Sequence, residues 1–476
     1  MSVSKNKFIV NVIWRFFERT GAQLVSFIVT LVIARLVTPE VFGVVALISV
    51  FIGVLQVFID SGLGNALVQK KDVDNIDFST VFYVNIFFCL IVYVVLFLTA
   101  PLISNFFAND DLTIYIRILG LLLIISGIKN VQQAYVSRNF LFKKFFFSTI
   151  IGTTMAAVIG VYLAKKNYGV WALIVQQLIN AFVDTLIVWC TVKWRPSLTF
   201  SFSRLQKLYS FAWKMLATSL INTIYNKLRE LLIGRYYSSS DLAYYNRGNI
   251  LPLLIIQNLD ASLSSVLLPT LSNIQDNKEK MKQIVKRTIK INTYILYPCL
   301  IGMVSVSNTL IYVLFSNVWM PSVPYLILFC YGYMFYPFYS ANLNLIAAIG
   351  RSDLYLKIEI VKKSIGLILL FLTFRYGVYA IAVSFLFERF FEMFIDVIPS
   401  GRMINYSLLE QIRDIVPNFF ISMIMGIIVF FIGKLEINML ILLMIQLVSG
   451  GLIYVSLSYI FNNESFHYLV KAIKRK

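Results

Sequence analysis

Residues 31–60 read LVIARLVTPEVFGVVALISVFIGVLQVFID, and residues 231–260 read LLIGRYYSSSDLAYYNRGNILPLLIIQNLD. Arg35 and Asp60 of the first stretch recur 200 residues later as Arg235 and Asp260, again among apolar side chains. Charged side chains are costly inside a bilayer, and internal duplication is common in transporter folds. The repeat therefore predicts a duplicated membrane bundle with a polar interior, which offers a substrate a path through lipid.

The composition is that of a chain shielded from water. Of its 476 residues, 59% are hydrophobic and only 14% are charged. A soluble domain carries roughly 25% charged residues. In lipid every backbone polar group must be paired within the chain, so long apolar segments of this kind form helices. We therefore expect an all-α polytopic membrane protein.

The net charge of +19 comes from lysines and arginines that cluster between the apolar segments. This placement favours membrane orientation and contact with anionic headgroups over binding of nucleic acid. The single histidine, His467, lies in the polar tail, and the four cysteines show no metal-ligand spacing. We expect no bound metal and no cofactor.

Apolar stretches long enough to span a bilayer recur along the whole chain. They predict fourteen helices, near 11–37, 41–60, 79–104, 112–134, 146–164, 168–192, 209–235, 243–270, 289–316, 322–349, 356–374, 378–398, 414–433 and 437–461.

Polar segments divide these helices into three parts. We expect an N-terminal lobe of six helices in residues 1–200 and a C-terminal lobe of six in residues 201–398. A linker, two more helices and a basic cytoplasmic tail take up residues 399–476. The basic, amphipathic segment 271–290 is expected to lie along the inner membrane surface. Lysines and arginines concentrate in alternate loops, so the positive-inside rule places both termini in the cytoplasm.

Polar residues recur on single faces of corresponding helices in the two halves. Two lobes related by a pseudo-twofold axis along the membrane normal would enclose a hydrophilic cavity between these faces. Hydrogen bonds between helices remain an alternative for the single polar residues, whereas buried arginines favour a cavity. The residues are Arg15, Arg19 and Gln23 in the first helix, Lys214, Asn222, Tyr225 and Arg229 in the seventh, Asn180 and Asp184 in the sixth, and Glu388 and Glu392 in the twelfth.

The four repeated charges lie toward the ends of their predicted helices. Asp60 and Asp260 are placed at the cytoplasmic ends, where a gate or loop anchor is favoured over substrate contact. Arg35 and Arg235 are placed near the outer ends. There they either reach the headgroups or line the outer mouth of the cavity.

Two motifs in the first half resemble a known family. Residues 33–43, IARLVTPEVFG, look like the LAR-L-x-P-E-x-F-G signature of bacterial polysaccharide transporters. Residues 58–69, FIDSGLGNALVQ, resemble the D-x-G-L-x-x-A-L-I-Q element of the same family. The copy in the second half is degenerate, with Ser239 in place of Pro39. Together the motifs resemble the Wzx-type flippases in the polysaccharide transporter branch of the MOP superfamily, which also contains the lipid II flippase and MATE exporters.

This resemblance implies a MOP fold, with two six-helix lobes and two additional C-terminal helices, and alternating access. It also implies a substrate, an undecaprenyl-pyrophosphate-linked oligosaccharide that is flipped across the bacterial cytoplasmic membrane for capsule, O-antigen or exopolysaccharide synthesis. Arginine suits a pyrophosphate, and amides and aromatic rings suit a glycan. The candidates are Arg15, Arg19, Lys214 and Arg229 for the pyrophosphate, and Gln23, Asn180, Asn222, Tyr225 and Asn226 for the glycan.

Two other functions compete with this interpretation. A MATE-like, cation-coupled exporter of amphipathic molecules should favour an acidic cavity, whereas the first and seventh helices carry basic residues. A membrane enzyme of the same glycan pathway is disfavoured because no nucleotide-binding motif, metal-spaced carboxylate pair or large polar loop is present. We therefore expect no enzyme.

The carboxylates of the sixth and twelfth helices bear on the energy source, and the resemblance implies the partners. Asp184, Glu388 and Glu392 are candidates for ion coupling, because a carboxylate in a cavity can take up a proton. Static pairing with basic residues such as Arg389 is the alternative. We expect a monomer in the phospholipid bilayer that works with the polymerase and ligase of its pathway.

Overall fold

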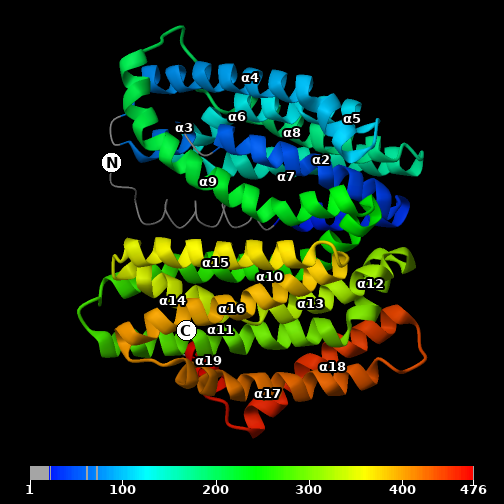
Figure 1. The fold of residues 1–476 in the computed structure, drawn as a ribbon, viewed down its shortest axis with the longest axis vertical. Helices are drawn as coiled ribbons and strands as arrows, with labels where there is room; N and C mark the ends of the chain where they lie inside the picture. The colour runs from blue at the N-terminus through cyan, green and yellow to red at the C-terminus, as the bar shows by residue number, and fades with distance from the viewer. Residues whose placement is uncertain (1–20, 22, 61–62, 71–72, 475–476) are drawn as a thin grey trace. The chain divides into compact units, whose positions relative to one another are not determined.

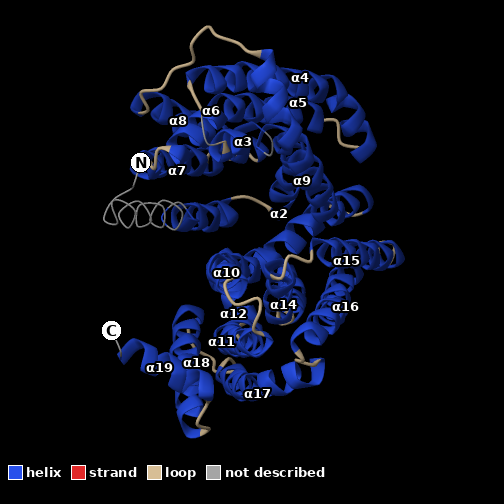
Figure 2. Cartoon of the chain, turned by 90° about the vertical axis from the view of Figure 1, so that its left-hand side faces the viewer, coloured by secondary structure: helices blue, strands red, loops and turns tan. Residues whose placement is uncertain are grey.

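The computed structural model describes residues 21, 23–60, 63–70 and 73–474. Within these residues the chain is helical and contains no strand (Figure 2). The chain folds into two compact units, Met1–Ala243 and Tyr244–Lys476. Each unit is described separately below.

The first unit is a bundle of long helices and shorter pieces (Figure 1). α7 and α8 form its most extensive packing, and α4 packs against α6. Its core contains Phe78, Val131, Val188 and Trp194. The helices are Gln23–Leu36, α2 (Pro39–Asp60), α3 (Leu63–Gln69), α4 (Asn75–Phe107), α5 (Leu112–Leu119), α6 (Leu121–Arg138), α7 (Phe142–Lys165), α8 (Val170–Thr191) and α9 (Phe202–Tyr236).

The second unit contains all but the first residues of α10 and every later helix. α11 packs against α17, and α15 packs against α16. The elements are α10 (Ser239–Ser272), α11 (Lys278–Ser305), α12 (Ser307–Phe315), a 3-10 helix (Asn317–Ser322), α13 (Val323–Tyr333), α14 (Tyr336–Ala348), α15 (Ser352–Thr373), α16 (Val378–Ile404), α17 (Leu408–Ile432), α18 (Met439–Ile460) and α19 (Glu464–Lys474).

The helices bear out the polytopic membrane class. In the described part of the chain, nine are long and apolar enough to cross a membrane, or ten if α11 and α12, bent by 77°, form one span. The predicted segments 209–235, 356–374 and 378–398 also form helices, namely α9, α15 and α16, but these fall outside that group. A total of fourteen spans therefore stays a prediction.

Two details differ from the sequence-based expectations. Residues 278–290 form the first turns of α11, so most of the segment expected on the membrane surface continues into an apolar helix. Asp260 does not end its helix, because α10 continues to Ser272, whereas Asp60 is the last residue of α2. The first copy has glycines at 62 and 64, where the second has serines that a helix accommodates.

The domain limits also differ from the compact units. α9, expected in the C-terminal lobe, packs with α2 and belongs to the first unit. The predicted lobe boundary at residue 200 rests on helix order and internal symmetry rather than on packing, and it stays a prediction. The expected basic tail contains an amphipathic helix, α19, that packs through Phe466 and Leu469.

An ion pair between the N-cap of α4 and the first turn of α9 stabilises the start of α4 in the first unit. Asp74 is the N-cap of this helix, and its side chain accepts a hydrogen bond from the backbone N–H of Asp77. The Arg204 guanidinium lies 2.5 Å from the Asp74 carboxylate. Its hydrogen bond holds the pKa of Asp74 below the ordinary value. The pair ties the start of α9 to the start of α4.

We expect Gly248→Ala to lower stability, because α10 and α13 approach closely at this residue. A Cβ there would lie 2.6 Å from the Tyr325 Cβ and 2.8 Å from the Leu326 backbone nitrogen. Such overpacking costs roughly 1–3 kcal/mol. The measurement is the thermal unfolding midpoint in detergent. Gly53→Ala is the matched control, because a Cβ there meets nothing within 4 Å, and an equal midpoint for both variants would contradict the packing argument.

Candidate functional site

The basic residues predicted to hold the pyrophosphate are only partly described. Arg15 and Arg19, together with the side chain of Lys214, lie outside the described residues. Arg229 is described on α9, and only 8% of its surface is exposed. A guanidinium buried in so apolar a chain is costly unless the protein or a ligand compensates its charge. Among the residues predicted for the pyrophosphate, Arg229 is thus the one whose burial the structure describes.

The predicted glycan residues fall on three helices of the first unit. Asn222 and Tyr225 are half-buried on α9, and Asn226 is exposed. Gln23 is half-buried at the start of the helix Gln23–Leu36. Asn180 lies on α8, where its Oδ1 accepts a hydrogen bond of 3.4 Å from the Thr153 hydroxyl. Asn222, Tyr225 and Asn226 lie within about one turn of α9, whereas Gln23 and Asn180 come from two other helices.

A polar cavity of about 300 Å³ lies within the first unit, lined by residues of α2, α3, α6 and α7. Asp60 lines it, and its carboxylate accepts hydrogen bonds from Gln56 Nε2 at 3.1 Å and Asn130 Nδ2 at 3.3 Å. Asn130 is only 8% exposed, and its Oδ1 has no hydrogen-bond partner among the described residues. Lys129 and Gln133 add two more polar side chains. The cavity offers both donors and acceptors, which suits a hydroxyl-rich ligand.

Lys129 also forms an ion pair with Asp184, between α6 and α8. The contact agrees with a static bridge at Asp184, the alternative that the sequence left open. Sequence reasoning missed Lys129, although a lysine inside an apolar segment is itself a signal. α7 approaches α8 at this level, since a Cβ on Gly152 would lie 3.1 Å from the Asp184 Cβ.

The second unit contains a larger buried charge cluster on α15 and α16. Lys362 is 2% exposed, and its ammonium lies 2.7 Å from Glu359 Oε1 and 3.3 Å from Asp396 Oδ1. It also lies 4.3 Å from the centre of the Tyr339 ring. Sequence analysis did not select Lys362 or Asp396, because their 34-residue separation conceals the pairing. Both side chains of the Lys362–Asp396 ion pair are buried.

Two carboxylates chosen from the sequence belong to the same region of α16. Glu392 is buried and accepts from the Arg389 guanidinium at 2.6 Å. Glu388, one turn earlier, is also buried. The helix thus stacks Glu388, Glu392 and Asp396 toward the protein interior at i, i+4 and i+8. The periodicity predicted this shared face for Glu388 and Glu392. Arg389 and Lys362 compensate part of this negative charge.

The repeated charges have different surroundings. Asp260 is half-buried and accepts hydrogen bonds from the Tyr336 hydroxyl and, at 3.4 Å, from the Ser264 hydroxyl. Arg235 is exposed, with its guanidinium 4.8 Å from the centre of the Phe106 ring. Arg35 is exposed at the end of its helix. Asp60 and Asp260 therefore accept hydrogen bonds from different kinds of side chain, despite their equivalent places in the sequence repeat.

No group of three or more metal-ligating side chains could hold an ion within the part of the chain that the structure describes. The four cysteines are unpaired thiols. The polar chemistry of the described residues thus consists of carboxylates, amides, hydroxyls and a few buried cations.

The chain is similar to proteins of polysaccharide synthesis. A family described as polysaccharide biosynthesis protein matches residues 32–324. The chain is 26% identical over 316 residues to the succinoglycan biosynthesis transport protein ExoT of Rhizobium meliloti. This match covers 66% of the chain and 64% of that relative, so the chain spans less than two thirds of the relative's length.

Two solved structures share the fold. The lipid II flippase MurJ, in an inward closed conformation, matches with a TM-score of 0.76 and 17% identity, over 95% of this chain and 98% of that one. An inward-facing multidrug resistance MATE transporter of the MOP superfamily matches with a TM-score of 0.63 and 15% identity, over 80% and 94% of the two chains. At these identities the likeness concerns the fold alone.

Proposed function

The chain belongs to the polysaccharide biosynthesis protein family and has the MOP fold, and on this premise we propose that it is a flippase for lipid-linked oligosaccharides. Its substrate is an undecaprenyl-pyrophosphate-linked oligosaccharide, moved across the bacterial cytoplasmic membrane during polysaccharide synthesis. The named transport role of ExoT and the flippase role of MurJ support this proposal. Both termini lie in the cytoplasm, and the chain acts as a monomer alongside the polymerase and ligase of its pathway.

The observation that carries the proposal is the buried Arg229 in a chain of this family. A pyrophosphate that leaves water needs fixed positive charge, and a guanidinium offers paired donors in a planar fork. In the proposal Arg15, Arg19 and Lys214 supply further positive charge along the same path. No bond is made or broken, so the protein acts as a transporter and not as an enzyme.

The remaining predicted residues keep their proposed roles. Gln23, Asn180, Asn222, Tyr225 and Asn226 contact the glycan, whose hydroxyls pair with amides and whose rings stack on aromatic faces. The four repeated charges lie at the gates or mouths of the proposed path. They are Arg35, Asp60, Arg235 and Asp260.

Coupling to an ion is proposed for the acidic residues of α16. Glu388 and Glu392 are both buried on this helix, and desolvation favours the protonated form of a carboxylate, so both are candidates for proton uptake. Asp184 has its own cation, Lys129, and is the weaker candidate for coupling. The paired Asp184 then serves to hold α6 against α8.

A reconstituted leaflet-exposure assay tests the function. Purified chain in proteoliposomes is supplied with an undecaprenyl-pyrophosphate oligosaccharide, and the fraction of glycan accessible on each face is followed with time. We expect exposure on the opposite face to rise faster than in protein-free liposomes. The absence of flipping, together with cation-driven efflux of an amphipathic dye, would contradict the proposal and support the MATE-like exporter.

A further inference from the structure

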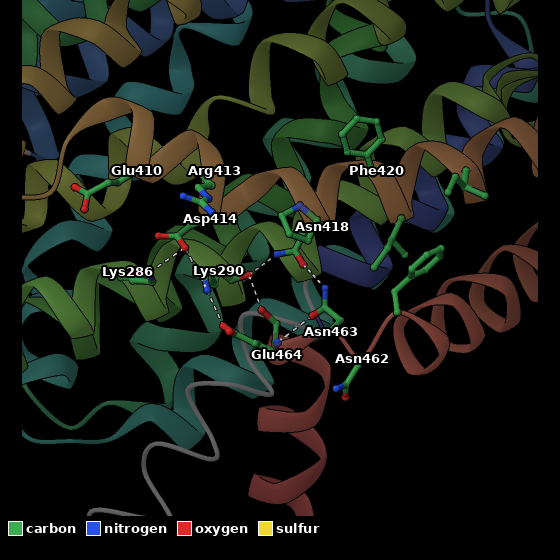
Figure 3. Close-up of a pocket in the computed structure, with 15 residues that line it drawn as sticks. Lys286, Lys290, Glu410, Arg413, Asp414, Asn418, Phe420, Asn462, Asn463 and Glu464 are labelled. Carbon is green, nitrogen blue, oxygen red and sulfur yellow. Dashed lines mark hydrogen bonds and ion pairs between the residues drawn. The ribbon is translucent and has the colours of Figure 1, made fainter.

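A pocket of about 710 Å³ lies in the second unit, between α11, α17 and the segment that joins α18 to α19 (Figure 3). Its polar end carries Lys286, Lys290 and Arg413, and its apolar end carries Phe420, Ile424 and Phe461. The pocket is thus amphipathic, with cations at one end and hydrocarbon at the other. These residues are neither among those proposed for the flipping path nor part of the buried charge cluster on α15 and α16.

One face of α17 forms the wall that joins the two ends. Arg413, Pro417, Phe420 and Ile424 are spaced by four, three and four residues, so they follow one another along the same side of the helix. All four are exposed. Moving along this face from the start of α17, an extended molecule would meet a guanidinium first and then apolar side chains.

The acidic residues of the pocket are already neutralised. Asp414 lies 3.0 Å from the Lys286 ammonium and 3.2 Å from that of Lys290. Lys290 also lies 2.6 Å from Glu464. Glu410 lies 3.2 Å from the ammonium of Lys282, beside the pocket. These four lysine contacts leave Arg413 as the additional positive charge, since no described residue forms an ion pair with it.

Hydrogen bonds hold the walls of the pocket in place (Figure 3). Asn418 Nδ2 donates to the Lys290 carbonyl at 2.9 Å, and Asn463 Nδ2 donates to Asn418 Oδ1 at 2.8 Å. Asn463 Oδ1 in turn accepts from the backbone N–H of Ser465 at 2.9 Å, in the first turn of α19. The pocket is therefore built by a connected network rather than left between loosely packed helices.

We propose that this pocket binds an anionic phospholipid of the surrounding bilayer. Its phosphodiester contacts the Arg413 guanidinium, and an acyl chain lies along Phe420 and Ile424. One additional positive charge matches the single negative charge of a lipid such as phosphatidylglycerol, whereas a pyrophosphate would call for more. Basic pockets between membrane helices are suited to such headgroups.

Lipid binding to the purified full-length chain tests the proposal. Native mass spectrometry gives apparent dissociation constants for phosphatidylglycerol and phosphatidylcholine. We expect tighter binding of phosphatidylglycerol, and Arg413→Gln should weaken it about tenfold, the loss of roughly one charge-assisted contact. The matched control is Arg402→Gln, because Arg402 is also exposed but lies on α16, away from the pocket. Its affinity should equal that of the unmodified chain.

A second variant tests the apolar end. Ile424→Asn should also weaken phosphatidylglycerol binding, because Ile424 is exposed and its replacement removes hydrocarbon contact without opening the core. Equal affinity for the two lipids, or unchanged binding in Arg413→Gln, would overturn the proposal. So would preferential, Arg413-dependent binding of undecaprenyl pyrophosphate, which would assign the pocket to the transported lipid. Because no transport is measured, failure here leaves the proposed flippase function untouched.

Discussion

Replacement of Arg229 with alanine is expected to slow flipping of an undecaprenyl-pyrophosphate oligosaccharide about a hundredfold. The guanidinium is 8% exposed on α9 in an apolar chain. A charged contact made away from water contributes roughly 1.5–3 kcal/mol, and each 1.4 kcal/mol corresponds to about tenfold. The measurement is the initial rate of leaflet exposure, normalised to the amount of inserted protein.

Matched variants separate the role of Arg229 from a general loss of folding. Lys227→Ala removes a cation two residues earlier on α9, where the ammonium pairs with Glu230 at 2.7 Å, and it should leave the rate near that of the unmodified chain. Arg229→Lys should recover part of the rate, because it keeps the charge and loses the planar fork. Normal flipping in folded Arg229→Ala would remove the residue from the substrate path.

Among the substitutions proposed for this chain, Lys362→Met is expected to lower the free energy of unfolding the most. Lys362 is 2% exposed and Asp396 is fully buried, with the ammonium 3.3 Å from the carboxylate. Removing one partner of a buried ion pair costs roughly 3–5 kcal/mol, because the other charge stays buried without compensation. We expect a lower thermal unfolding midpoint in detergent and less folded protein after purification.

A double-mutant cycle distinguishes this cause from a change of shape. Asp396→Asn in the Lys362→Met background should restore part of the midpoint, since the orphaned charge is then gone. Lys357→Met is the control, because Lys357 is exposed on the same helix, α15. If the midpoint of Lys362→Met equals that of the control, the buried pair does not stabilise this unit.

Local patterns predicted much of the helical layout. Hydropathy marked the segment 41–60, which forms α2 (Pro39–Asp60), and the segment 437–461, which forms α18 (Met439–Ile460). Periodicity also placed Glu388 and Glu392 on one buried face of α16. These features depend on residues within a few turns of one another, and such residues are neighbours in the sequence.

The amino-acid sequence by itself determined the membrane class, the helices and the candidate residues on their polar faces. Only the tertiary structure decided which charges meet: Lys129 with Asp184, Lys362 with Asp396, and Lys290 with both Asp414 and Glu464. It also joined α11, α17 and α19 around one amphipathic pocket. The reason is physical. The order of residues within one segment determines its helical period and which of its faces is apolar. The pairing of side chains between helices depends on how whole helices rotate and pack against one another, and no single segment determines that packing.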